Sequence, residues 1–136
     1  MTSDFLIKQN GPVTDEELLE LRASVGWDNK TGSPKEVLRR LFTYFTARYE
    51  GRLVGFVDVL SDGIADAYLQ DLMVHPDFQR KGVGTQLVKS AIWYLQSINI
   101  KAIQTNFNPG LEEFYKKFGF HIYQAGILDR DAVKKP

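Results

Sequence analysis

The 136-residue sequence contains no cysteine, and this absence removes several classes of chemistry. Without cysteine there is neither a disulfide framework nor a catalytic thiol, so no acyl group can be held on a protein sulfur. No apolar run approaches the ~20 residues that a transmembrane helix needs, and the first residues lack the basic and then apolar pattern of a signal peptide. The sequence therefore predicts a cytoplasmic protein without a membrane partner.

The sequence also lacks an excess of charge of either sign. Its 17 Lys and Arg residues balance 17 Asp and Glu residues, so the formal net charge is zero and we expect no nucleic-acid partner. The two histidines, His75 and His121, do not pair with a carboxylate at metal-ligand spacing, and we predict no metal. With 43% hydrophobic and 25% charged residues, the chain has an ordinary globular composition that fits one domain, residues 1–136.

Hydrophobic periodicity and capping signals predict the order of the elements. Thr14 and Glu17 have the capping-box spacing, and Ser33-Pro34 is typical of a helix start. Helices are predicted at 14–25, 34–44, 82–97 and 111–118. Strands are predicted at 5–8, 46–50, 53–60, 67–74, 100–107 and 120–123. Strands on both sides of a long helix indicate an α/β (α+β) fold, with a mixed, mostly antiparallel central sheet and helices on both faces.

The segment 72–84 runs from a predicted strand into a predicted helix and contains the strongest functional signal. Gly82 and Gly84 have no Cβ, so the backbone there can approach a ligand closely. The first N–H groups of the helix lack intrahelical partners and lie at the positive end of its dipole. Arg80 and Lys81 add two cations beside them. A pyrophosphate fits such a site.

Other interpretations of this segment are weaker. A glycine-containing turn can simply begin a helix, but the longer pattern of strand, proline, Gln-Arg-x-Gly-x-Gly and amphipathic helix is more specific. A Walker A loop would need a lysine where Gly84 precedes Thr85. A dinucleotide-binding fingerprint would follow the first strand of a βαβ unit rather than an antiparallel meander.

The run Gln79-Arg-Lys-Gly-Val-Gly84 resembles the acetyl-CoA pyrophosphate loop of the GNAT N-acetyltransferase family. A second block resembles the same family, because Asn108 is followed seven residues later by Tyr115 and then by a Gly-Phe pair at 119–120. The two blocks span about the second half of the chain, and the first half agrees in its order of elements. The resemblance implies a GNAT-like acyl-CoA N-acyltransferase fold. It also implies transfer of the acetyl group of acetyl-CoA to an amine by direct attack in a ternary complex.

The resemblance also implies a role for each matched residue. The backbone of Leu72, Met73 and Val74 would pair with the pantetheine arm. Asn108 would bind the cofactor near the thioester, and Tyr115 would be the general acid for the leaving thiolate. The pyrophosphate would lie against the loop residues Gln79, Arg80, Lys81, Gly82, Val83, Gly84 and Thr85. A non-catalytic acyl-CoA-binding sensor or interaction domain is the alternative, and Tyr115 argues against it.

The general base departs from the family pattern. Some relatives have a glutamate five residues before Asn108, and Ile103 occupies that position here. Gln70 and Asp71 precede the loop on a strand whose alternation places them on opposite faces, so one of them can face the site. We choose Asp71 as the base, acting directly or through water. The alternative is a hydrogen-bonded carboxylate of the sheet.

The acceptor pocket is expected between the first two helices, their connecting loop and the strands beneath them. Trp27, Asp28 and Tyr44 are the candidate acceptor-binding residues there, with Asp28 as an anchor for an ammonium group. The acceptor remains open among a small arylalkyl amine, a polyamine, an aminoglycoside and a protein N-terminus, that is, a small-molecule or peptide amine. Sheet edges near the C-terminus are compatible with a homodimer.

Overall fold

The structure is a computed structural model that describes residues 4–27 and 32–129. The chain forms two compact units, residues 1–105 and residues 106–136. The first unit contains the five-stranded sheet and three α-helices, and the second contains one short α-helix, after which the described residues 120–129 form no helix or strand. Among the described residues, no helix is both long enough and apolar enough to cross a bilayer.

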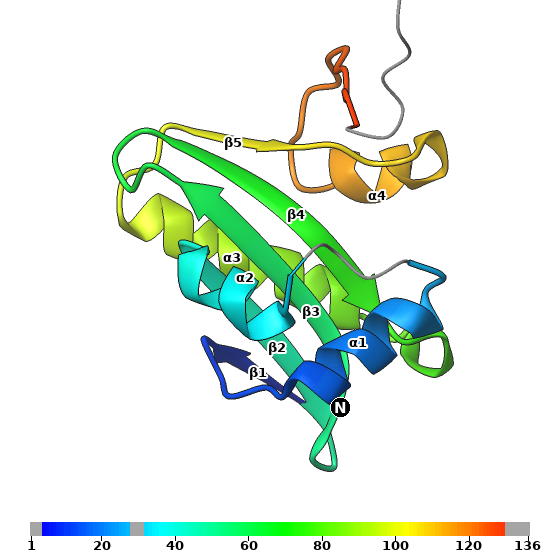
Figure 1. Cartoon of the computed structure of the whole chain (residues 1–136). Helices are drawn as coiled ribbons and strands as arrows, with labels where there is room; N and C mark the ends of the chain where they lie inside the picture. Colours follow the sequence, from blue (N-terminus) through cyan, green and yellow to red (C-terminus); the bar gives the residue numbers. More distant parts are fainter. Residues whose placement is uncertain (1–3, 28–31, 130–136) are drawn as a thin grey trace, which may run out of the picture. The chain divides into compact units, whose positions relative to one another are not determined.

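The first unit is built on one five-stranded sheet, drawn in Figure 1. In sequence order its strands are β1 (Phe5–Gln9), β2 (Thr43–Tyr49), β3 (Arg52–Ser61), β4 (Asp66–Val74) and β5 (Ala102–Thr105). They lie in the same order across the sheet, antiparallel except for the final pair, β4 and β5. The sheet is therefore mixed and mostly antiparallel, which confirms the predicted fold class.

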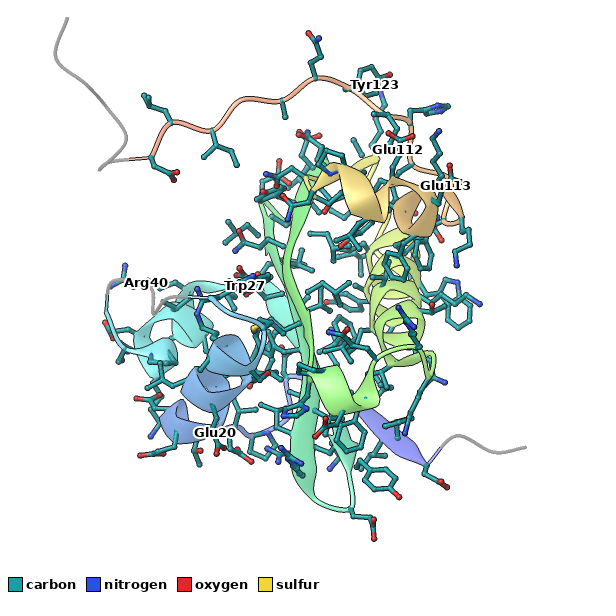
Figure 2. The ribbon with its side chains drawn as sticks, turned by 90° about the vertical axis from the view of Figure 1, so that its right-hand side faces the viewer. Glu20, Trp27, Arg40, Glu112, Glu113 and Tyr123 are labelled. Carbon is teal, nitrogen blue, oxygen red and sulfur yellow. The ribbon has the colours of Figure 1, made fainter. Side chains whose placement is uncertain are left out.

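Helices cover both faces of this sheet, as Figure 2 shows in a view along it. On one face lie α1 (Asp15–Ser24) and α2 (Pro34–Arg40), and on the other lies α3 (Val83–Ser97), which connects the parallel strands. The inner side of α3 is apolar, and its residues Leu87, Val88, Ala91 and Leu95 are fully buried. On the opposite face, α1 buries Leu18 and Leu21 in a cluster with Leu53, Phe56 and Met73.

The start of α1 is held by the capping box that the sequence predicts. The Thr14 hydroxyl accepts the Glu17 N–H at 3.1 Å, and the Thr14 N–H donates to the Glu17 carboxylate at 3.0 Å. The same carboxylate accepts two hydrogen bonds from Arg48 in β2, at 2.6 and 2.9 Å. The hydrogen bonds from Arg48 are the largest influence on Glu17 and lower its pKa to about 2. This ion pair fixes α1 against the sheet.

Several predicted elements differ from the structure. The helix expected at 34–44 ends at Arg40, and β2 begins at Thr43, because the Thr-Tyr-Phe-Thr run at 43–46 favours an extended backbone. The strand predicted at 120–123 was wrong, since the described residues 119–129 contain no strand. The apolar residues there resemble a strand in sequence, but a strand needs a hydrogen-bonding partner. The last helix, α4 (Glu112–Lys116), is shorter than predicted and follows a single 3₁₀ turn at Pro109–Leu111.

Gly55 in β3 allows α3 to approach the sheet closely. A Cβ at this position would lie 2.9 Å from both Leu87 Cδ1 and Val83 Cγ1, and 3.2 Å from the Ala47 Cβ. We expect Gly55→Ala to lower the free energy of unfolding by about 1–3 kcal/mol, because the helix must move away from the sheet. Urea unfolding measures this loss. Gly110→Ala is the matched control, since its Cβ meets nothing within 4 Å, and equal stability of the two variants would contradict the prediction.

Candidate active site

The loop between β4 and α3 adopts the conformation that an anion site needs. Gly82 is the N-cap residue of α3 with φ of 87°, and Arg80 also has a positive φ of 63°. No side chain caps the start of α3, and a Cβ on Gly82 would find no heavy atom within 4 Å. The first-turn N–H groups of a 15-residue helix therefore border open space at the positive end of its dipole. An anionic group can bind there.

Polar contacts from the end of β4 fix the course of this loop. The His75 N–H donates to the Val54 carbonyl at 2.8 Å, and its Nδ1 accepts the Asp77 N–H at 3.1 Å. The Gln79 side-chain amide donates to the Val74 carbonyl at 2.9 Å. His75 thus has a structural role, and the Gln79 side chain holds the loop in place. The backbone of the residues after Gln79 is then the part of the loop that could contact a ligand.

Phe78 holds the loop through aromatic contacts and lies next to two cationic side chains. Its ring contacts Tyr49 and Phe5, with centroid distances of 5.3 and 6.1 Å. The Lys81 Nζ lies 5.7 Å from the ring centroid and the Arg52 Cζ lies 5.8 Å from it, in cation–π contacts. Positive charge therefore gathers beside the start of α3, where a pyrophosphate would be stabilised.

A β-bulge separates the two halves of β4. Two steps along β3, from Phe56 to Asp58, oppose three steps along β4, from Met73 to Gln70, so β4 contains one extra residue. Asp71 lies within the bulge with φ of 57°. An extra residue of this kind bends the strand and changes the direction of its side chains.

The pairing of β4 with β5 also stops at this bulge. The last β5 residue, Thr105, lies opposite Leu69, and β4 continues to Val74 (Figure 1). In the described structure, no β5 residue therefore pairs with the part of β4 from 70 to 74. Its backbone can add an extended ligand at that edge, as in strand addition. The predicted pantetheine residues Leu72, Met73 and Val74 lie on this part of β4.

A pocket opens on the α1 and α2 side of the sheet. Its described lining comes from α1, the residues leading into α2, α2 itself, β3 and β4, and consists of Leu18, Leu19, Arg22, Gly32, Pro34, Val37, Leu38, Phe56, Asp58, Asp71 and Met73. Asp71 faces the pocket because of the bulge, whereas Gln70 is not part of the described lining. The pocket lies on the side of the sheet where the sequence predicts the acceptor site, and Asp71, the predicted base, is one of its lining residues.

Asp58 is a second carboxylate in this pocket, and sequence reasoning missed it. Only 2% of the residue is exposed, on a strand where every residue from Leu53 to Val59 is buried. The available signal was a single acidic residue inside an otherwise apolar run. Because charged residues are rarely fully buried without a reason, such a residue indicates a site or a polar network.

The other predicted acceptor residues lie outside the described lining of the pocket. Trp27 follows α1 and is 39% exposed, with the Arg22 Cζ 5.4 Å from its ring centroid (Figure 2). The Tyr44 hydroxyl donates to the Gly11 carbonyl at 2.7 Å, and burial raises its pKa. Its ring stacks on Phe56, which does line the pocket. Asp28 lies outside the described residues.

The second unit contains the two remaining predicted residues. Tyr115 in α4 is buried, and its ring stacks on Phe107 with a centroid distance of 4.4 Å. Edge contacts with Phe114 and Phe120, at 5.0 and 5.9 Å, complete its aromatic surroundings. Asn108 is exposed at the start of the 3₁₀ turn and makes no capping hydrogen bond to it.

Among the described residues, no group of three or more His, Asp or Glu side chains is arranged to hold a metal ion.

A family model described as an acetyltransferase (GNAT) domain matches residues 40–122, which include the bulged strand, the loop, α3 and Tyr115. The chain belongs to the GNAT family. This N-acetyltransferase has the mixed sheet and the helix arrangement of that family, as the sequence predicted.

Individual relatives agree with this assignment. The uncharacterized N-acetyltransferase ycf52 of Pyropia yezoensis is 29% identical over 96% of this chain and 75% of the relative. The protein of the same name from Gracilaria tenuistipitata var. liui is 32% identical over 92% of this chain and 68% of its own. A GNAT family acetyltransferase structure from Streptococcus pneumoniae is 26% identical, with a TM-score of 0.76 and coverage of 93% and 98% of the two chains.

Proposed function

We propose that this N-acetyltransferase binds acetyl-CoA along residues Leu72–Val74 of β4 and the start of α3, and transfers the acetyl group to an amine. The observation that supports this most directly is the continuous path from the bulged strand into the Gly82 turn. The strand edge offers backbone hydrogen bonds to an extended arm, and the helix start offers N–H groups and cations to a pyrophosphate. An acyl-CoA has both parts in that order.

The proposed reaction needs no protein nucleophile. The amine nitrogen attacks the thioester carbonyl carbon, the carbon–sulfur bond breaks, the amine loses one proton and the departing thiolate gains one. Asp71, in the acceptor pocket, is the proposed proton acceptor, and Tyr115 is the proposed donor to the thiolate. Backbone N–H groups beside the bulge would stabilise the negative charge that develops on the carbonyl oxygen.

Ligand binding and turnover test this proposal separately. Acetyl-CoA is expected to raise the melting temperature of the full chain, because a ligand that binds only the folded state stabilises it by mass action. An acyl-pantetheine without the pyrophosphate should do so less. Thiol release over a panel of amines then measures transfer. Absence of any stabilisation by acetyl-CoA would contradict the proposal, and stabilisation without thiol release on any amine would indicate a non-catalytic acyl-CoA-binding protein.

Four further expectations stay predictions: a single domain over residues 1–136, a cytoplasmic location, the absence of nucleic-acid and membrane partners, and a homodimer. Gel filtration with light scattering tests the last of these on the purified chain.

A further inference from the structure

The walls of the acceptor pocket are mostly apolar. Leu18, Phe56 and Met73 belong to the buried cluster beneath α1, and Leu38 of α2 packs against that cluster. Each of these side chains also lines the pocket. A bound group that touches these walls loses contact with water and gains only apolar neighbours. The walls therefore favour an alkyl or aryl body and disfavour a hydroxyl-rich one, whose polar groups would be left without hydrogen bonds.

The charged groups of the pocket are one guanidinium and two carboxylates among its described lining residues. Asp58 is 2% exposed, so water screens its interactions only weakly. The Arg22 guanidinium lies over the exposed Trp27 ring, at the end of α1. Among these described residues the carboxyl groups outnumber the guanidinium, and such a set favours a cationic ligand group over an anionic one.

The strand register places Asp58 beside the proposed reaction centre. Asp58 lies opposite Gln70, the residue before Asp71, and neighbouring strands lie about 4.8 Å apart. Asp58 and Asp71 both line the pocket, and Asp71 directly precedes residues Leu72–Val74 of β4. An ammonium group that reaches Asp58 is brought close to the proposed base and to the strand edge proposed for the thioester arm.

We propose that Asp58 binds the ammonium group of the acceptor, and that the acceptor is an amine on an apolar body with no carboxylate next to the amine. This inference rests on the proposed function. Asp58 accepts a hydrogen bond from the incoming ammonium group, a proton passes to Asp71, and the neutral nitrogen then attacks the thioester. A carboxylate on the carbon next to the amine would lie against these two carboxylates and would be repelled.

A pair of acceptors that differ by one carboxylate tests the substrate class on the unmodified protein. The amine 3-methylbutylamine is leucine without its carboxylate, and thiol release from acetyl-CoA is measured with each. We expect kcat/KM for 3-methylbutylamine to exceed that for leucine by at least about 100-fold, from repulsion between like charges in a poorly screened pocket. The amine of leucine is the less basic of the two, so the supply of neutral amine alone would favour leucine. Glucosamine, an amine on a hydroxyl-rich body, should be as poor as leucine.

Single substitutions test whether Asp58 binds the ammonium group of the acceptor. Asp58→Asn should raise the KM for 3-methylbutylamine about 10- to 100-fold, the scale of a hydrogen bond to a charged group, while kcat changes little. Asp71→Asn should instead lower kcat. The matched control is Asp66→Asn, which removes an exposed carboxylate at the far end of β4. The melting temperature with acetyl-CoA reports whether each variant is folded, and the substrate pair tests the proposal even if Asp58→Asn does not fold.

A second readout separates this inference from the proposed function. With CoA in place of acetyl-CoA, no transfer occurs, and 3-methylbutylamine should still raise the melting temperature of the wild type more than that of Asp58→Asn. Amine binding that depends on Asp58 but gives no turnover would support the pocket assignment and contradict the transfer proposal. Turnover on leucine or glucosamine equal to that on 3-methylbutylamine would overturn the inference and leave the transfer proposal intact. An unchanged KM in a folded Asp58→Asn variant would also overturn it.

Discussion

Gly82→Asp is expected to abolish measurable acetyl-CoA binding while the chain stays folded. A side chain at Gly82 would enter the open space in front of α3, because no heavy atom lies within 4 Å of the position of its Cβ. A carboxylate there would repel the proposed pyrophosphate, and a pair of like charges about 4 Å apart costs about 1–4 kcal/mol at a protein surface. Together with the lost approach of the ligand to the backbone, this predicts a loss of affinity of at least about 100-fold. Isothermal titration with acetyl-CoA measures it.

Two matched variants separate charge from backbone strain. Asn has nearly the shape of Asp and tolerates a positive φ, so Gly82→Asn should lose less affinity than Gly82→Asp. Gly51→Asp places the same side chain in the β2–β3 hairpin, where φ is 82° and the surroundings are equally open. It should bind acetyl-CoA as the wild type does. Wild-type affinity in a folded Gly82→Asp variant would refute the anion site at the start of α3.

The loop and its helix were predictable from sequence because their signals are local. A glycine at a helix start, the cations beside it and the apolar spacing of α3 all lie within about 20 consecutive residues. The same holds for the capping box of Thr14 and Glu17, which the structure reproduces in both of its hydrogen bonds. Local geometry of this kind depends on backbone propensity and on unpaired helix groups, and tertiary contacts change it little.

The pocket beside α1 and α2 was predictable only in outline, because its details depend on pairing between strands. Simple alternation along β4 could not show that a bulge at Asp71 turns this residue toward the pocket. Asp58 was missed for a related reason. Its importance comes from the strand register, which places it opposite Gln70, and from its burial. Neither property can be predicted from the residues next to Asp58 in the sequence. The contact of Arg48 with Glu17 likewise joins residues 31 positions apart.

Aromatic residues led to two wrong predictions of secondary structure, at the end of the helix predicted at 34–44 and at the strand predicted at 120–123. Phe42 and Phe45 have a spacing that suits a helix as well as a strand, and the hydrogen bonds of Phe45 and its neighbours with β1 and β3 decide for the strand. The segment 120–123 has the apolar composition of a strand, but composition does not supply a partner. Both errors show that a strand is specified by its neighbours in the sheet more than by its own residues.

Tyr115→Phe is expected to reduce turnover by roughly 10- to 1000-fold, with little change in acetyl-CoA affinity, as for the loss of one proton donor in the transition state. The substitution removes the hydroxyl and keeps the ring. The ring should stay in place, because it stacks on Phe107 with an angle of 14° between the planes and has edge contacts with Phe114 and Phe120. A stable fold with a slow chemical step is therefore the expected phenotype.

Tyr123→Phe is the matched control for removal of a phenol, since Tyr123 is 84% exposed in the same unit, and it should keep full turnover. The rate must be measured in a single turnover with a good amine, so that chemistry rather than product release is observed. Full single-turnover activity in Tyr115→Phe would remove Tyr115 from the mechanism. Loss of the cooperative thermal transition in that variant would show that the hydroxyl serves the packing of this aromatic cluster instead.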